Sequence, residues 1–169
     1  MDIKVNVQTD PIGLAAENWV AHGWADAADG MALVTSVMRV QQLLLARVDH
    51  LLRPHGLTFA RFEVLRLLAF TRTGTLPIGK IGERLQVHAA SVTNAVTRLE
   101  VDGLVGRAPN PDDGRSVLVT LTPAGRDRVE TCTELLNDEV FRHVPLSPDA
   151  QRQAFAALRD VRRAYGDLA

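Results

Sequence analysis

The sequence predicts a mainly α-helical protein that carries one small β-hairpin. Apolar residues recur at steps of three and four over most of the chain, as expected for helices with one buried side. Helix-capping residues, glycines and prolines stand where such helices would begin and end. A single β-branched run, Ser116 to Thr122, follows the turn-forming residues Pro111 to Gly114 and has the alternation of a strand.

The first half of the chain predicts three helices. An N-terminal helix runs from Pro11 to about His22, and a longer one runs from about Asp29 to Arg53, where Pro54 stops it. A third helix begins after the cap residue Thr58 and ends before the Arg-Thr-Gly break at 72–74. The apolar stripe of the second helix, formed by Leu33, Val37, Val40, Leu44 and Val48, is too long for one small domain to cover.

The second half predicts a helix-turn-helix, a hairpin and two closing helices. A helix at 77–85 is joined by a turn at 86–88 to a helix at 89–102, and so short a connection suggests helix-turn-helix. Gly103 ends the second of these helices, and strands at 104–108 and 116–122 follow. Thr122-Pro123 and Ser147-Pro148 have the sequence of a cap followed by proline, which predicts helices at 123–141 and 148–165.

Composition and residue spacing reduce the number of functions that the chain could have. The 169 residues suit one domain, and the single Cys132 and the lack of an export signal or of about 18 successive apolar residues favour a cytoplasmic protein outside the membrane. The five histidines are scattered without the spacing of a zinc site, and the run GKIGERL lacks the phosphate-loop pattern. We therefore expect no catalytic residues, no metal and no cofactor, and we expect Cys132 to be a small buried side chain.

The helix at 89–102 carries the residues with the clearest candidate function. At about 100° per residue, Val92, Ala95, Val96 and Leu99 form one apolar side, while Thr93, Asn94 and Thr97 lie opposite with Ser91 and Arg98 on the flanks. Such a polar face suits the DNA major groove, where Asn and Arg make paired hydrogen bonds to base edges and hydroxyls bind phosphates. An ordinary solvated helix face is the alternative.

The hairpin adds a cation to this arrangement. Arg115 stands at the predicted hairpin tip, from which a guanidinium could enter a DNA minor groove, whose negative potential attracts arginine. We expect the Asp113 carboxylate to hold this guanidinium in an outward pose. The alternative is a solvent-exposed ion pair of little energetic value.

The helix order, the run SVTNAVTRLEVDGLVGR and above all DGRSVLVTLTPAGR resemble the MarR family of bacterial transcription regulators over about residues 31–166. The resemblance implies a winged helix-turn-helix flanked by dimerisation helices, with an N-terminal extension at 1–28, dimerisation helices at 29–54 and 123–169, and a DNA-binding lobe at 55–122. It implies a homodimer that binds double-stranded DNA at a pseudo-palindromic operator as a ligand-responsive repressor. The alternative function is a winged-helix dimerisation or protein-interaction module that binds no operator.

The resemblance also suggests a small aromatic acid as effector, bound between the dimerisation helices and the DNA-binding lobe. Candidate pocket residues are Trp19, His22, Trp24, Arg47 and Glu63. Trp19, His22 and Trp24 supply two aromatic rings and a titratable group, and Glu63 stands where the urate-responsive branch of the family has an acid. The alternative is that the tryptophans only pad the dimer interface.

Overall fold

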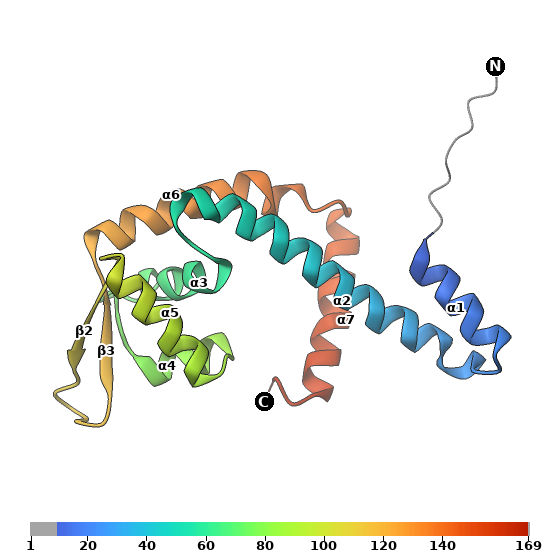
Figure 1. Ribbon diagram of the computed structural model, residues 1–169, viewed down its shortest axis with the longest axis horizontal. Coiled ribbons are helices and arrows are strands. Elements are labelled where there is room, and N and C mark those ends of the chain that lie inside the picture. The colour runs from blue at the N-terminus through green and yellow to red at the C-terminus, as the bar shows by residue number, and fades with distance from the viewer. Residues whose placement is uncertain (1–9, 169) are drawn as a thin grey trace, which may run out of the picture. The chain divides into compact units, whose positions relative to one another are not determined.

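The computed structural model describes residues 10–168, and its elements confirm the predicted fold class (Figure 1). The α-helices are α1 (Pro11–Ala21), α2 (Ala25–Leu52), α3 (Phe59–Ala69), α4 (Ile78–Leu85), α5 (Ala89–Val101), α6 (Pro123–Glu139) and α7 (Pro148–Ala164). Two short 3-10 helices, Arg53–His55 and Phe141–His143, and the strands β1 (Thr75–Pro77), β2 (Val105–Pro109) and β3 (Val117–Leu121) complete the secondary structure of these residues. The chain forms two compact units, Met1–Arg47 and Val48–Ala169.

In the first unit, α1 begins as its sequence predicts. The Asp10 carboxylate accepts a hydrogen bond from the Ile12 backbone N–H at 3.0 Å, and Pro11 occupies the first turn. The backbone turns at Gly23, whose φ of 90° is accessible to glycine and costly for other residues. α2 then starts at Ala25, four residues earlier than the sequence predicted.

Helix α2 is exposed along most of its length and is apolar. Eight of its large apolar side chains are exposed in the single chain: Leu33, Val34, Val37, Met38, Val40, Leu43, Leu44 and Leu45. By length and composition alone, Ala25–His55 could cross a membrane, so the expectation that no segment would qualify is wrong. A single such helix is weak evidence for a membrane span, because helices with apolar faces in soluble proteins meet the same criterion.

The last turn of α2 belongs to the second unit. Val48 and Leu52 are buried in its core, and the Asp49 carboxylate accepts a 2.7 Å hydrogen bond from the Phe59 backbone N–H at the start of α3. The expectation that Val48 would be shared between chains is therefore wrong, since its side chain is covered by its own lobe. The apolar stripe available to a partner ends before Val48.

The sheet contains a strand that the sequence did not predict. β1 pairs antiparallel with β3, with Leu76 opposite Val119, so that the order of strands is β1-β3-β2. β2 pairs antiparallel with the other edge of β3, with Val105 opposite Leu121. At three residues, one of them Pro77, β1 is too short to show any alternation.

The junction of β3 and α6 explains the Thr-Pro-Ala-Gly segment. The Thr122 hydroxyl accepts a hydrogen bond from the Gly125 backbone N–H at 3.0 Å and lies 3.0 Å from the Leu104 carbonyl oxygen, to which it can donate. A Cβ atom at Gly125 would lie 2.0 Å from that carbonyl oxygen, so only glycine fits there. The cap and the glycine together bring α6 against the start of the hairpin.

One core joins the elements of the second unit from the end of α2 to α6. Its fully buried side chains include Leu65, Leu68, Ile81, Val96, Leu99, Val119, Val129 and Leu136. Cys132 is also fully buried, as predicted, and burial raises the pKa of its thiol against a smaller opposing effect of the Arg128 charge. The thiol is therefore a packing group, because a nucleophilic cysteine needs the opposite shift.

Candidate nucleic-acid interface

Helix α5 has the buried and exposed sides that the sequence predicted. Val92, Val96 and Leu99 are buried against the core, whereas Ser91, Thr93, Asn94, Thr97 and Arg98 are exposed. The imidazole of His88 caps the helix, its Nδ1 accepting a hydrogen bond from the Ala90 backbone N–H at 3.2 Å. The turn before it passes through Gln86, a non-glycine residue with a φ of 54°.

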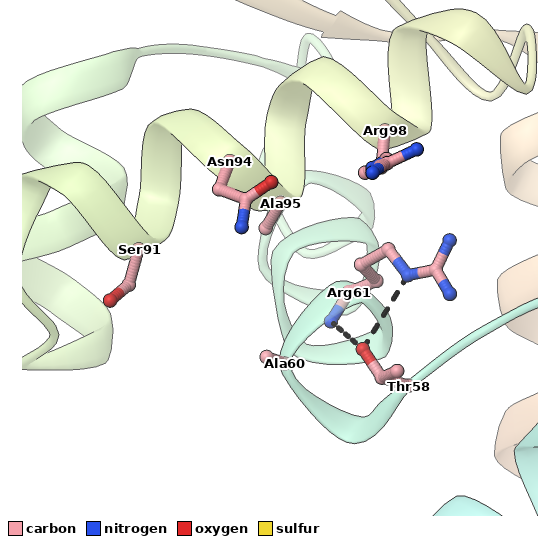
Figure 2. A pocket seen from close by; sticks show the side chains of 7 residues that line it. All are labelled: Thr58, Ala60, Arg61, Ser91, Asn94, Ala95 and Arg98. Carbon is pink, nitrogen blue, oxygen red and sulfur yellow. Dashed lines mark hydrogen bonds between the residues drawn. The ribbon is translucent and has the colours of Figure 1, made fainter.

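One flank of α5 faces the start of α3 across an open hollow of about 510 Å³ (Figure 2). The hollow is lined by Ser91, Asn94, Ala95 and Arg98 from α5 and by Thr58, Ala60 and Arg61 from the start of α3. Two guanidinium groups and several hydrogen-bonding side chains therefore share one concave surface. Such a surface suits an anionic, hydrogen-bonding polymer better than an apolar ligand.

The two arginines of this hollow differ in how they are held. Arg61 is 3.3 Å from a carboxylate oxygen of Asp102 and also approaches the Thr58 hydroxyl at 3.5 Å. Within residues 10–168, no ion pair or hydrogen bond is found for the exposed Arg98 guanidinium. Arg98 is thus the better placed of the two to bind a group outside the chain.

The hydroxyl groups on the other flank of α5 are already engaged. Thr93 donates to the Ala89 carbonyl oxygen at 3.0 Å, and Thr97 donates to the Thr93 carbonyl oxygen at 2.8 Å. The Thr97 hydroxyl also accepts a 2.6 Å hydrogen bond from Arg107 of β2. Thr97 therefore has an internal role that its sequence position did not reveal.

The hairpin tip presents Arg115 without the ion pair that we expected. The Asp113 carboxylate accepts a 3.0 Å hydrogen bond from the backbone N–H of Arg115, forming an Asx turn, and makes no ion pair with the guanidinium. The bond from the Ser116 N–H to the Asp113 carbonyl, 2.9 Å long, closes the same turn. Asp113 is a turn-forming residue, and Arg115 is exposed in the loop between β2 and β3.

The candidate ligand residues are brought together only in part. Trp19 lies edge-on to Trp24 with ring centroids 5.5 Å apart, and His22 stacks on Trp24 at 5.9 Å. Arg47 is near the other end of α2, about 33 Å from Ala25 at 1.5 Å per residue, so one chain does not join it to the tryptophans. Glu63 lies half-buried in α3 of the second unit, where burial raises the pKa of its carboxyl.

The comparisons with known proteins place this geometry in a family. Residues 57–117 match the MarR family. Sco5413, a MarR family transcriptional regulator from Streptomyces coelicolor, is 47% identical with a TM-score of 0.75, and the match covers 83% of this chain and 98% of that one. The chain belongs to the MarR family.

Two other members are similar over most of their length. The HTH-type transcriptional repressor IacR of Pseudomonas putida is 28% identical over 123 residues, which are 73% of this chain and 72% of IacR. A MarR variant from E. coli, solved in complex with operator DNA, is 26% identical with a TM-score of 0.72, covering 80% of this chain and 96% of that one.

Membership settles the general function. The protein is a winged helix-turn-helix transcriptional regulator: α4 and α5 form the helix-turn-helix, and β2 and β3 form the wing. Double-stranded DNA is the macromolecular partner that MarR family structures support. MarR family regulators are soluble proteins that generally form dimers, and the relatives found are regulators rather than enzymes.

Three residues that organise the MarR-type lobe were not among the DNA-binding residues that the sequence predicted. Arg61 lines the hollow beside α5, and Arg107 reaches α5 from the wing. Gln86 accepts a 3.1 Å hydrogen bond from Arg162 of α7 and donates to the Asp167 carbonyl oxygen, so the end of the chain contacts the turn of the helix-turn-helix. Only Arg107 had a sequence signal, because it follows the buried Val105 by two residues and so projects from the same face of the sheet.

Proposed function

We propose that the protein is a cytoplasmic, non-enzymatic repressor that binds a pseudo-palindromic operator as a homodimer. In this proposal α5 of each chain enters a major groove and the wing enters the adjacent minor groove. Ser91, Asn94 and Arg98 contact the DNA from α5, and Arg115 contacts it from the wing. Thr93 also faces the groove, whereas Thr97 and Asp113 act by holding local structure.

The observation that carries the proposal is the exposed flank of α5. Asn94 and Arg98 are one turn apart on the helix, they line the same open hollow, and both are exposed. Asn and Arg are the side chains that read adenine and guanine edges through paired hydrogen bonds. The exposed Arg115 on the same lobe supplies a second, cationic contact of the kind that narrow minor grooves attract.

The homodimer is supported by the apolar surface that a single chain leaves uncovered. Besides the residues of α2, the side chains of Phe155, Leu158 and Val161 on α7 are exposed. Monomeric soluble proteins rarely leave so many large apolar side chains exposed along one helix as α2 does. A second copy that covers α2 and α7 would also give the two recognition helices the two-fold relation that a palindromic site requires.

The proposed effector is a small aromatic acid. The cluster of Trp19, His22 and Trp24 offers aromatic faces for such a ligand, and Arg47 offers a cation from the same unit. In a single chain the cation and the cluster are too far apart to bind one small molecule, so the effector site is proposed for the dimer. If the tryptophans only pad the dimer interface, any effect of an aromatic acid on DNA binding will not depend on them.

An electrophoretic mobility shift tests the operator proposal directly. The wild-type protein is titrated against the DNA upstream of its own gene, with an unrelated fragment of equal length as competitor. Arg98→Gln is compared with Arg152→Gln, which removes the same charge from α7. We expect a specific complex that Arg98→Gln weakens and Arg152→Gln leaves intact.

The alternative is a winged-helix module that dimerises or binds another protein without recognising an operator. The exposed apolar residues of α2 and α7 would serve that function equally well. Under this alternative no genomic fragment forms a specific complex at low salt. Specific binding that survives an excess of competitor DNA excludes it.

A further inference from the structure

Arg107 joins the wing to the recognition helix. It lies on β2, opposite Val119 of β3, and its guanidinium reaches across to α5. Its Nη2 donates to the Thr97 hydroxyl at 2.6 Å and approaches the Thr93 carbonyl oxygen at 3.4 Å. Its Nε is 3.3 Å from a carboxylate oxygen of Glu100, so the guanidinium spans two turns of the helix.

Most of the Arg107 side chain is withdrawn from solvent. The Arg107 side chain is 25% exposed, and its Nε is hidden from water without a well-aligned hydrogen bond. A withdrawn cation is costly unless a nearby anion compensates it, and Glu100 supplies that anion. Arg107 therefore contrasts with Arg98 and Arg115, which are exposed and have no such partner among residues 10–168.

These contacts also occupy the Thr97 hydroxyl both as a donor and as an acceptor. Its hydroxyl has one proton, which is given to the Thr93 carbonyl, and an oxygen that accepts from Arg107. A hydroxyl committed in this way has little capacity left to donate to a phosphate or a base. The Thr97 hydroxyl is thus the point where β2 is attached to α5.

We propose that Arg107 is a positioning residue for DNA recognition: it sets the angle between wing and recognition helix through Thr97 and Glu100, and it does not itself contact DNA. The proposal rests on the function proposed above. Because α5 and the wing occupy neighbouring grooves, a change in their relative angle misaligns one when the other is seated. Affinity for the specific sequence should then fall more than non-specific affinity, which depends on attraction to the phosphates.

The experiment measures binding across a series of salt concentrations by fluorescence anisotropy. Two probes are used: the duplex that the wild-type protein enriches from a random-sequence library, and a scrambled duplex of the same composition. The variants are Arg107→Gln, Arg107→Lys, Thr97→Val, Thr97→Ser and the double variant Arg107→Gln/Thr97→Val. Arg115→Gln serves as the reference for a direct contact, and the thermal unfolding of each variant is recorded.

We expect Arg107→Gln, Arg107→Lys and Thr97→Val each to lower affinity for the enriched duplex by about tenfold, as for loss of one charged hydrogen bond. Affinity for the scrambled duplex and the slope of log K against log salt should stay at wild-type values. Thr97→Ser keeps the hydroxyl and should bind normally. The double variant should bind no worse than Arg107→Gln, because both changes break the same link.

Three results would overturn the inference. Arg107→Gln could reduce the salt slope by about 0.9 for each phosphate that it no longer neutralises, with Arg107→Lys restoring the slope, which would mean that Arg107 binds phosphate directly. Thr97→Ser could lose as much affinity as Thr97→Val, which would show that the methyl group matters. The double variant could lose as much binding free energy as Arg107→Gln and Thr97→Val together, which would mean that the two residues act independently. If Arg107→Gln does not fold, Arg107→Lys and the two Thr97 variants still test whether Arg107 positions the helix. If the wild-type protein enriches no sequence, the proposed function itself fails.

Discussion

Arg66 of α3 and Glu130 of α6 form a two-point ion pair, with nitrogen–oxygen distances of 2.9 and 3.0 Å. The same guanidinium donates to the Thr133 hydroxyl at 3.2 Å and lies 4.5 Å from the centre of the Phe70 ring. A helix of the helix-turn-helix lobe is thereby bonded to the helix that continues toward the C-terminus. The pair is bidentate, which makes its geometry more specific than that of a single surface contact.

The first prediction concerns acid stability. The hydrogen bond from Arg66 lowers the pKa of the Glu130 carboxyl below its ordinary value. The pair therefore stabilises the fold above the ordinary carboxyl pKa, and this contribution is lost as the pH falls through the lowered value. Because the Glu130 side chain is 54% exposed, we expect Glu130→Gln to cost only about 0.2 to 1 kcal/mol at pH 7.

Thermal unfolding at several pH values checks this effect. The difference in unfolding temperature between wild type and Glu130→Gln should shrink toward zero in strong acid. It should also shrink in 1 M salt, which screens the ion pair. Glu134→Gln removes an exposed acid from the same helix and is the control. A difference that persisted unchanged in strong acid would mean that the charge on Glu130 is irrelevant.

The second prediction concerns Glu63, whose pKa is shifted in the opposite direction to that of Glu130. Burial raises the pKa of Glu63, so the folded protein favours the protonated carboxyl and loses stability as the pH rises from the ordinary value toward the raised one. Glu63→Gln removes this penalty. We expect a small rise in the unfolding temperature at pH 7 that disappears near pH 4, measured by calorimetry. A fall at pH 7 would show that the ionised carboxylate has a stabilising partner, such as a group from the second chain.

The third prediction separates the two classes of DNA contact. Asn94→Ala should relax preference at one base position, at a cost of about 1 to 3 kcal/mol for the preferred base, with an unchanged salt slope. Arg115→Gln should instead weaken binding to all sequences and reduce the salt slope. Binding to a set of single-base operator variants at several salt concentrations distinguishes the two patterns. Identical behaviour of both variants would refute the assignment of helix and wing to different readouts.

The sequence predicted those features of the lobe that depend on neighbouring residues. Helix α5 lies within one residue of its predicted bounds, because its apolar spacing and the glycine after it are local signals. Likewise, Thr122 caps α6 as predicted, since the capping bond joins residues three apart.

The features that it missed depend on residues distant in the chain. β1 exists only because β3 pairs with it across more than forty residues, as between Thr75 and Thr120. The link from Arg107 to Thr97 depends on how the hairpin packs on α5, and α5 composition alone made Thr97 look like a DNA contact. Val48 was assigned to the dimer because periodicity shows which residues share a side but not what covers that side.

The fourth prediction is that folding and dimerisation are coupled. Leu44→Glu places a charge in the exposed apolar stripe of α2, where a partner chain would have to bury it. Light scattering should then show monomers or aggregates, and the unfolding temperature of the wild type should rise with protein concentration. Gln42→Glu adds a charge on the opposite side of the same helix and should remain dimeric. A stable wild-type monomer at micromolar concentration would contradict the dimer.

The fifth prediction concerns the N-terminal segment, which contains both tryptophans of the chain. Both tryptophans lie in one cluster, with ring centroids 5.5 Å apart, so tryptophan fluorescence reports on this cluster alone. If an aromatic acid binds there, titration with salicylate or benzoate should change the emission, and the same concentrations should release DNA in the mobility-shift assay. Trp19→Phe and Trp24→Phe leave one reporter each and identify which ring responds.

Deletion of residues 1–28 then distinguishes sensing from padding. Loss of the effector response with normal DNA binding assigns a sensing role to the segment. A lower unfolding temperature with a normal response assigns it to the dimer interface, because deletion removes the packing of Trp19, Trp24 and the buried Ala28. If neither quantity changes, the Trp19–Trp24 contact is a local feature of α1 and the start of α2, without consequence for the regulator.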